Sequence, residues 1–283
     1  MAKLLEGKPL ADQIKEKMKE EVAGLSNKPV LASIMVGENA GAASYVRSQA
    51  KAAENLGIVY QLHTLSADTA EETLIEFIQK LNSDKSIHGI IVQMPLPVSI
   101  DYKKISQFIL PEKDIEGMHP ANMGKIVFGK AGLLPCTPQA VMELLNVSGV
   151  DLYGKEVVIV GHSEIVGKPL ALLLLEKLAT VTVCHIGTSQ AGKLEEHVRK
   201  AEVLVVAVGK AGLIRGEWIK EGAVVIDVGI NRVGDKIVGD VEFEGAQMRA
   251  SWITPVPGGV GPLTVIMLMR NCVEAAKEQK ATR

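Results

Sequence analysis

The sequence predicts an α/β protein with two domains, because short apolar runs alternate with amphipathic helical stretches along the chain of 283 residues. Each short apolar run is interpreted as a buried strand, and each longer periodic stretch as a helix. This alternation is typical of a mostly parallel sheet with helices on its faces.

The first series of elements has predicted helices at 9–25, 44–57 and 69–81 and predicted strands at 30–36, 58–65 and 89–93. An apolar stripe at helical spacing supports the first helix: Leu10, Ile14, Met18 and Val22. The second helix ends at Gly57, a typical helix terminator. The third opens with residues 69–72, Thr-Ala-Glu-Glu, which we interpret as a capping box.

The second series begins near residue 138, with predicted helices at 138–146, 168–178 and 263–278 and predicted strands at 155–160, 180–184, 203–208 and 223–228. Gly209 and Gly229 close two of these strands. We therefore predict a first domain of residues 1–138 and a second of residues 139–264. The terminal helix, residues 265–283, is expected to pack back on the first domain.

The composition argues against several functions. Lys and Arg number 31 against 33 Asp and Glu, and the net charge of −2 leaves no basic surface for nucleic acid or membranes.

The three cysteines are Cys136, Cys184 and Cys272. They are far apart and form no CxxC motif, so we expect neither a disulfide framework nor a metal site. Such cysteine usage is typical of the reducing cytoplasm. The longest apolar runs, such as 170–175, are too short to cross a bilayer.

Residues 157–170 read as a strand, a tight turn and a helix, the context of a phosphate-binding turn. The match to GxGxxG is incomplete: Ser163 occupies the place of the second glycine, and Gly167 falls one place late. An ordinary strand-to-helix turn is the alternative. About 20 residues further on, where a ribose-reading group belongs, residues 184–188 contain no Asp, Glu or Arg.

The cofactor preference follows from charge. A 2′-phosphate requires positive charge, preferably from a guanidinium group, whereas His162 and His185 supply only partial charge. We therefore favour NAD as the cofactor, without excluding NADP. Both histidines can also be turn residues without a ligand.

Tyr45 and Gln49 are four residues apart in the predicted helix 44–57, so they share one face. A tyrosine and a lysine at this spacing would form a proton-transfer pair. The amide of Gln49 cannot exchange a proton near neutral pH, which indicates binding and orientation at this position.

Several motifs occur together in a fixed order: residues 93–97 (QMPLP), 111–117 (PEKDIEG), 135–138 (PCTP), 161–169 (GHSEIVGKP), 225–231 (VIDVGIN) and 254–262 (TPVPGGVGP). With these motifs the chain resembles the bifunctional methylenetetrahydrofolate dehydrogenase/methenyltetrahydrofolate cyclohydrolases over its full length. The resemblance implies two α/β domains with a folate cleft between them, the second a Rossmann-type domain that binds the nicotinamide cofactor, and a homodimer. It implies oxidation of 5,10-methylenetetrahydrofolate to the 5,10-methenyl form, which is then hydrolysed to 10-formyltetrahydrofolate.

The resemblance also assigns residues. It implies catalytic positions at Tyr45, Gln49, Gln93 and Glu116, and folate contacts at Tyr45, Gln93, Pro95, Leu96, Glu116, Gly258, Gly259 and Pro262. It implies cofactor contacts at Cys136, Thr137, Gly161, His162, Ser163, Val166, Gly167, His185, Thr188, Gly209, Gly229 and Ile230. For Cys136, packing in a hinge is the favoured role over reactivity.

The chain departs from the family at positions that bear on chemistry. Gln49 occupies the position of the catalytic lysine, and Glu116 that of an aspartate that holds the pterin. Ala42 replaces a serine, His162 replaces an arginine, and residues 186–187 replace a polar and basic pair that helps hold the 2′-phosphate. The last two changes agree with the preference for NAD.

Hydride transfer requires little acid–base help from the protein, but hydrolysis requires a group that moves protons. We therefore predict a dehydrogenase whose cyclohydrolase activity is weak or absent. Lys51 cannot replace the lysine without a change of helical register, because it lies on another face. One alternative is a bifunctional enzyme in which another group or a water replaces the lysine. Another is a folate- and dinucleotide-binding protein without turnover.

Overall fold

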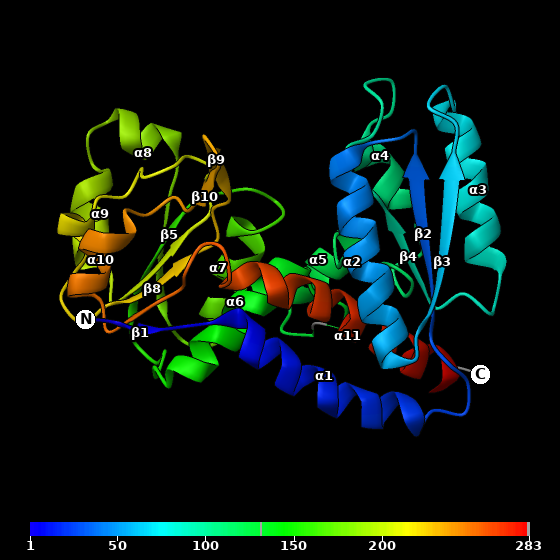
Figure 1. Cartoon of the computed structure of the whole chain (residues 1–283), viewed down its shortest axis with the longest axis horizontal. Helices are drawn as coiled ribbons and strands as arrows, with labels where there is room; N and C mark the ends of the chain where they lie inside the picture. Colours follow the sequence, from blue (N-terminus) through cyan, green and yellow to red (C-terminus); the bar gives the residue numbers. More distant parts are fainter. Residues whose placement is uncertain (131, 282–283) are drawn as a thin grey trace. The chain divides into compact units, whose positions relative to one another are not determined.

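The computed structural model describes residues 1–130 and 132–281 of the chain, whose elements are labelled in Figure 1. The chain forms two compact units. The six-stranded unit consists of Met1–Asp12 and Thr137–Thr264, and the three-stranded unit of Gln13–Cys136 and Val265–Arg283. The boundaries between them fall within the helices α1 (Gly7–Ala23), α6 (Cys136–Ser148) and α11 (Val260–Ala281).

The first 12 residues correct our predicted domain boundary. We assigned residues 1–138 to one domain, but Met1–Asp12 belongs to the six-stranded unit. The reason is a short strand, β1 (Lys3–Leu4), that pairs in parallel with β11 (Trp252–Ile253) at the edge of that sheet. Two residues are too few to give a periodic signal in the sequence.

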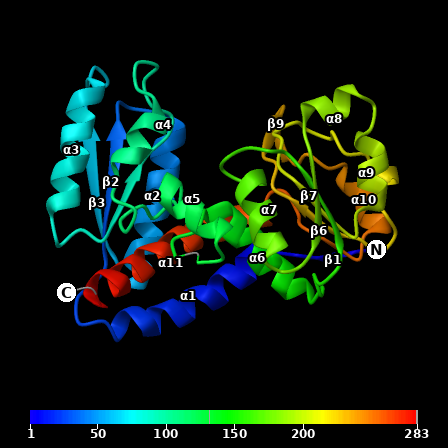
Figure 2. The ribbon, with the colours of Figure 1, turned by 180° about the vertical axis from the view of Figure 1, so that it is seen from behind.

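The three-stranded unit contains a parallel sheet in the order β3 (Val59–Leu65), β2 (Val30–Val36), β4 (Gly89–Val92). Helices α2 (Ala40–Leu56) and α3 (Glu71–Ser83) lie on opposite faces of this sheet, as Figures 1 and 2 show. Ala32 and Ile34 pack with Leu74 and Ile78 of α3. Because strand side chains alternate, Ser33 points to the other face and carries a polar group beneath α2.

The helix termini of this unit show one error in our sequence interpretation. The helix α2 ends at Gly57, which has the left-handed φ of 76° that favours glycine. The predicted capping box at the start of α3 is wrong, because the hydroxyl of Thr69 donates to the carbonyl of Ser66. The residue before α3 is Ala70, which has no capping side chain.

Buried Lys113 caps the other end of α3. Its ammonium donates to the carbonyls of Leu81, Asn82 and Asp84, all within 3.0 Å.

Two short helices that the sequence did not predict follow the sheet. They are α4 (Tyr102–Ile105), continued by the 3₁₀ turn η1 (Ser106–Phe108), and α5 (Pro120–Val127). These segments fix the loop that contains residues 111–117.

The six-stranded unit has an all-parallel sheet in the order β1-β11-β8-β7-β5-β6, which confirms the predicted α/β fold with a Rossmann-type domain. Its other strands are β5 (Glu156–Val160), β6 (Thr180–Cys184), β7 (Val203–Val206) and β8 (Val224–Asp227). The chain leaves β5 toward β6 and then returns to β7 on the other side of β5. This reversal places a ligand crevice at the carboxyl ends of these strands.

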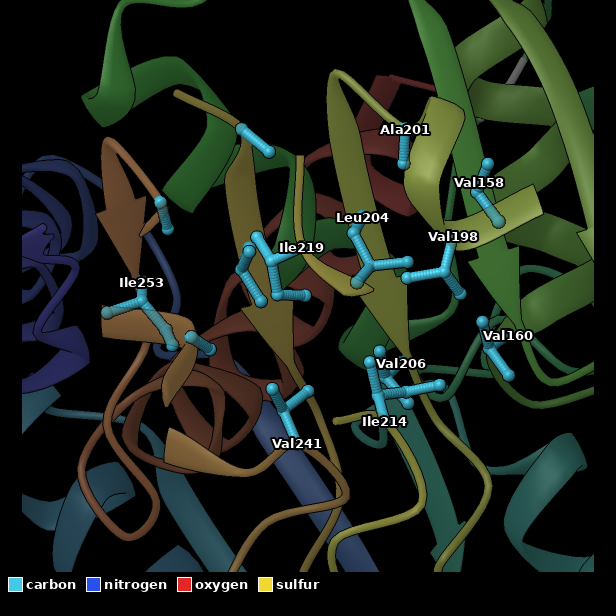
Figure 3. Close-up of a cluster of buried hydrophobic side chains, with 14 of the residues drawn as sticks. Val158, Val160, Val198, Ala201, Leu204, Val206, Ile214, Ile219, Val241 and Ile253 are labelled. Atoms are coloured by element: carbon cyan, nitrogen blue, oxygen red, sulfur yellow. The ribbon is translucent and has the colours of Figure 1, made fainter. Parts of the chain in front are cut away.

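The remaining elements of this unit are the helices α7 (Gly167–Leu175), α8 (Ile186–Gln190), α9 (Leu194–Lys200) and α10 (Phe243–Arg249), the 3₁₀ turn η2 (Gly216–Trp218), and the hairpin β9 (Asn231–Val233) with β10 (Lys236–Val238). The sequence did not predict α8, α9, α10, β11 or the hairpin. The core on one face of the sheet combines Val158 and Leu204 with Val198 of α9, as Figure 3 shows. In the described ranges, no helix is long and apolar enough to span a membrane.

Candidate functional site

Four polar side chains form a cluster in the three-stranded unit, which we call the amide cluster: the buried Ser33, Gln49 and Gln93 and the partly buried Tyr60. The Gln49 side chain is fully buried. Its Oε1 accepts from the Tyr60 hydroxyl at 2.9 Å and from Gln93 Nε2 at 2.8 Å. Gln93 Nε2 also donates to Ser33 Oγ at 3.0 Å. The cluster joins α2, β2, β3 and the end of β4.

Two donors on one oxygen fix the orientation of the Gln49 amide. Burial raises the pKa of Tyr60, so its hydroxyl keeps the proton that it donates. The other end of the amide, Nε2, is buried and lies toward the hydroxyl of Tyr45, whose pKa it lowers, but it makes no direct hydrogen bond in the part of the chain that the structure describes. A buried donor without an acceptor is costly, so Nε2 is suited to donate to a ligand.

Tyr45 lies one helical turn before Gln49, with 40% of its surface exposed. Burial of its hydroxyl raises its pKa above the usual value, and the nearby Cys136 and Glu116 add to this effect, whereas Gln49 opposes it. Tyr45 is therefore a neutral phenol near pH 7. It can bind a flat ligand with its ring but is a poor base.

Glu116 is the group in this region with a pKa near neutrality. Its Oε2 accepts from the hydroxyl of Tyr102 at 2.9 Å. Burial raises the pKa of Glu116 to about 7, the hydrogen bond from Tyr102 lowers it, and the charge of Asp114 raises it further. Gly117 holds the backbone here with a φ of 69°, and a side chain on Gly117 would collide with the backbone of Leu134.

Cys136 lies near Tyr45 and Glu116, in the three-stranded unit. Its thiol donates weakly to the carbonyl of Ile115 at 3.6 Å. Burial raises the pKa of Cys136 well above its usual value, which makes it an unreactive thiol. It does not line the dinucleotide pocket described below, so its predicted cofactor contact is not part of that pocket.

The other predicted folate contacts divide between the two units. Pro95 is exposed and follows a cis peptide bond, and Leu96 packs against the core under α3. Gly258, Gly259 and Pro262 belong to the six-stranded unit. There the carbonyl of Gly258 accepts from the backbone N–H of Gly7 at 2.8 Å.

Two glycines in the turn after β5 allow close backbone contacts, although the glycine pattern of this turn is incomplete. Gly161 has a φ of 124°, and a Cβ there would lie 2.3 Å from the carbonyl oxygen of Ala207. A Cβ on Gly167 would lie 2.0 Å from the carbonyl oxygen of Gly161. Gly167 therefore allows α7 to approach the turn closely. Ser163, in the place of the second glycine, accepts from the backbone N–H of Val166 at 3.1 Å.

A cavity of about 430 Å³ opens at the carboxyl ends of β5, β6 and β7. Its polar lining comes from His162, Ser163, Glu164, His185, Ser189 and Lys210. The rings of His162 and His185 are 5.2 Å apart between centroids. This is the strand reversal at which open α/β sheets bind dinucleotides, and we call it the dinucleotide pocket. The sequence did not single out Glu164 or Lys210, although Glu164 lies within a recognised motif.

The remaining predicted cofactor residues shape loops around the pocket or lie outside it. Thr188 accepts from the backbone N–H of His185, the residue that caps the start of α8. The backbone N–H groups of Gly209 and Gly229 donate to the carboxylates of Asp240 and Asp227. Three further predicted residues, Thr137, Val166 and Ile230, do not line this pocket. Their contacts with a cofactor stay predictions.

Asp227 and Asp240 are structural residues that sequence reasoning missed, although Asp227 lies in the motif 225–231. Asp240 accepts from three consecutive backbone N–H groups, those of residues 208–210. Burial raises the pKa of Asp227 to about 6, against the effect of its backbone hydrogen bonds. A larger cavity of about 600 Å³ lies nearby, between Asp227, Arg215 and Glu242, but no predicted site residue lines it.

Metal binding has no structural support within residues 1–130 and 132–281, where no group of three or more His, Cys, Asp or Glu side chains could hold an ion. The three cysteines are free thiols, and Cys184 and Cys272 are buried. The cytoplasmic setting drawn from cysteine usage stays a prediction.

The fold and these two regions define an α/β dinucleotide-binding protein with a second polar cluster in a separate unit. Comparison with known families is consistent with this class. The catalytic domain of tetrahydrofolate dehydrogenase/cyclohydrolase matches residues 5–116, and its NAD(P)-binding domain matches residues 135–280. The chain belongs to the tetrahydrofolate dehydrogenase/cyclohydrolase family, which confirms the resemblance found in its sequence.

Relatives match over nearly the full length. The bifunctional protein FolD of Geotalea uraniireducens is 51% identical, over 99% of this chain and 100% of that protein. The FolD enzyme of Campylobacter jejuni has a solved structure with a TM-score of 0.95 and 46% identity, covering 98% of this chain and 99% of that one. The FolD of Trypanosoma brucei, solved with NADP and an inhibitor, has a TM-score of 0.93 and 40% identity, covering 100% and 99%.

Proposed function

We propose that this protein oxidises 5,10-methylenetetrahydrofolate to 5,10-methenyltetrahydrofolate with a nicotinamide dinucleotide. One observation supports this proposal most strongly. A chain of this family holds the glycine turn of the dinucleotide pocket, the amide cluster with Gln49, and the buried contact between Tyr102 and Glu116. The fixed orientation of the Gln49 amide and the raised pKa of Glu116 also favour an enzyme over a binding protein without turnover.

The amide cluster is compatible with hydride transfer. The lone pairs of N5 and N10 in the folate expel the hydride and leave a delocalised cation, so the protein needs no strong acid or base. The nicotinamide, when bound, accepts the hydride. Gln49 is neutral and therefore places no positive charge near a developing cation. Its Nε2 can donate to the substrate, while Tyr45 offers a neutral ring surface.

We also propose the second family reaction, hydrolysis of the methenyl form to 10-formyltetrahydrofolate. The amide of Gln49 predicts, from the sequence alone, that this activity is weak or absent. The comparisons favour the bifunctional alternative, because relatives about half identical over the full length are called bifunctional proteins. In this chain Gln49 cannot carry the proton. Gln49 Nε2 can orient the attacking water, which passes its proton to a further water.

For the cofactor we propose a preference for NAD. A 2′-phosphate entering the dinucleotide pocket would meet His162 and His185 in place of a guanidinium, and the carboxylate of Glu164. Lys210 contributes positive charge to the same pocket, and Lys168 pairs with Glu164 at 3.0 Å, so both moderate the repulsion. The expected result is a graded preference, not exclusion of NADP.

Three further statements complete the proposal: the substrate is a small tetrahydrofolate derivative, the protein acts as a homodimer, and it needs neither nucleic acid nor a membrane. Light scattering coupled to size-exclusion chromatography measures the oligomeric state directly. A monomeric mass at micromolar concentration would contradict the dimer.

The decisive experiment follows the methenyl product and the reduced cofactor as separate absorbance signals, with methylenetetrahydrofolate and either NAD or NADP. We expect NADH to form while methenyl disappears faster than it does without enzyme. Stoichiometric accumulation of methenyl would contradict the proposed hydrolysis and leave the dehydrogenase intact. No reduction of either cofactor would contradict the enzyme as a whole.

A further inference from the structure

Tyr102 is held at both ends of its side chain, although none of the sequence motifs includes it. It is the first residue of α4, directly after Asp101, whose carboxylate accepts from the backbone N–H of Lys103 at 2.9 Å. Its ring packs against the hydrophobic core that contains Ile105. Its hydroxyl donates to Glu116 Oε2 at 2.9 Å. The core therefore sets the position of the ring, and the ring sets the position of the hydroxyl.

The side chain that Tyr102 contacts has an unusual need for support. Glu116 has one more rotatable bond than the aspartate that the family resemblance leads one to expect at this position. A longer carboxylate samples more positions, and fixing it costs conformational entropy. The hydrogen bond to Oε2 restricts these positions. It leaves Oε1 to accept from a ligand, since each carboxylate oxygen can accept separately.

We propose that Tyr102 is a positioning residue that holds the Glu116 carboxylate in place for the ring N–H and amino groups of a pterin. This inference rests on the proposed folate substrate and adds a residue that recognises it. The hydroxyl compensates for the longer side chain, so that Glu116 and Tyr102 act together as one acceptor.

The same contact governs the response of substrate binding to pH. The groups that face Glu116 are Tyr102 of α4, Asp114 of the same loop, Cys136 of α6 and Tyr45 of α2. Burial raises the pKa values of both tyrosines and of the thiol, so these three stay neutral between pH 6 and pH 8. Asp114 adds negative charge, and only the hydroxyl of Tyr102 lowers the pKa of Glu116. Without that hydroxyl, the carboxylate should protonate at higher pH and lose its acceptor role earlier.

The test is Tyr102→Phe, with initial rates measured against methylenetetrahydrofolate between pH 6 and pH 9. Removing the hydroxyl should raise KM for the folate about tenfold at pH 8 and leave kcat within about twofold. The acid limb of kcat/KM should move to higher pH. Tyr153→Phe is the matched control, because Tyr153 is an exposed tyrosine of the other unit, and both constants should stay unchanged.

A second variant separates positioning from general packing. Glu116→Asp shortens the carboxylate, and the double variant with Tyr102→Phe should be little worse than Glu116→Asp alone, since Tyr102 acts through Glu116. Additive losses would overturn the proposal. An unchanged KM and pH profile in Tyr102→Phe would overturn it too, as would a parallel fall of kcat, kcat/KM and melting temperature.

Failure of the proposed function gives a different result. Binding of methylenetetrahydrofolate to the wild-type protein is measured by calorimetry without the dinucleotide, independently of turnover. If the wild-type protein binds the folate and Tyr102→Phe binds it equally well, only the positioning role is overturned. If the wild-type protein binds no folate, both the positioning role and the proposed function are overturned.

Discussion

The dinucleotide pocket and the amide cluster are built from different parts of the polypeptide. The turn after β5 depends on the absence of side chains, because Gly161 and Gly167 let backbone approach backbone within distances that no Cβ allows. The amide cluster depends on side chains, because Gln49, Tyr60 and Gln93 meet through their polar ends. The first region can therefore change its side chains and keep its shape. In the second, one exchange changes which atoms donate and accept.

This difference explains why the substitutions in the two regions have unequal consequences. His162 stands where the family resemblance gives an arginine, yet the turn around it is intact. Gln49 stands where the resemblance gives a lysine, and here the whole hydrogen-bond pattern is adapted to an amide oxygen that accepts twice. We expect the first exchange to alter preference and the second to alter chemistry.

The largest effect is expected from a side chain placed in the glycine turn. Gly161→Ala adds a Cβ 2.3 Å from the carbonyl oxygen of Ala207, at a φ of 124°. The turn must shift, and a misplacement of about 1 Å can lower a reaction rate about 100-fold, so we expect a loss of this size in kcat/KM for the dinucleotide, measured from initial rates. Gly192→Ala is the control, because Gly192 also has a positive φ of 71° but has open space around it. Equal loss in both variants would show that strain alone, not the close approach, matters.

The next effect concerns the residue that distinguishes the amide cluster. Gln49→Lys introduces a group that can move protons, and we expect methenyl hydrolysis to rise about 10- to 100-fold. Gln93 can adapt by turning its amide, so that its oxygen accepts from the new ammonium. The rate of methenyl disappearance without dinucleotide measures this step alone.

Lys51→Gln is the matched control for Gln49→Lys, because Lys51 is an exposed residue of the same helix. Its hydrolysis rate should equal that of the wild-type protein. A fall would show that Lys51 takes part after all. An unchanged rate in Gln49→Lys would show that a group at this position does not limit proton transfer.

A smaller effect is expected in the dinucleotide pocket. His162→Arg adds a guanidinium beside His185 and should shift the ratio of kcat/KM for NADP over NAD about tenfold toward NADP. Glu164→Gln should shift the ratio in the same direction by less, since Lys168 already pairs with that carboxylate. A shift toward NAD in either variant would contradict the proposed orientation of the 2′-position in this pocket.

The sequence predicted those features whose cause is local. Tyr45 and Gln49 are one helical turn apart, and Gly161 lies at the end of an apolar strand, so short patterns identified both regions. The partners of Gln49 could not be found in this way, because Gln93 is 44 residues away and only the sheet register brings them together. The same is true of Tyr102, which reaches Glu116 across 14 residues.

Short elements were missed for a related reason. The strands β1 and β11 have two residues each and are defined by their pairing, not by any periodicity. The predicted capping box failed because Thr69 found a closer acceptor in its own turn. Local patterns thus predicted the main helices and strands, and the contacts between distant segments decided the remainder.

The smallest effect contrasts two buried carboxylates through stability. The pKa of Glu116 is raised from 4.5 to about 7, so the folded state holds its proton longer than the unfolded state does. This carboxyl group therefore contributes most below pH 4.5, and its contribution is lost as pH rises to about 7. Glu116→Gln removes that loss. It should stabilise the protein by about 1–2 kcal/mol at pH 8.5 and leave stability at pH 4 unchanged.

Asp227→Asn is expected to act in the opposite direction, although the pKa of Asp227 is also raised, to about 6. Its two oxygens accept from the backbone N–H groups of Gly229, Asp240 and Val241, and an amide keeps only one of these acceptor oxygens. The melting temperature of Asp227→Asn should therefore fall at both pH 4 and pH 8.5, because buried donors lose their acceptors.

The control is Glu112→Gln, because Glu112 is an exposed glutamate of the same loop as Glu116. This variant should leave the stability unchanged at both pH values. If Glu116→Gln instead destabilised the protein at pH 8.5, Glu116 would be a structural acceptor like Asp227, and the contrast between a carboxylate kept for a ligand and one used by the fold would fail.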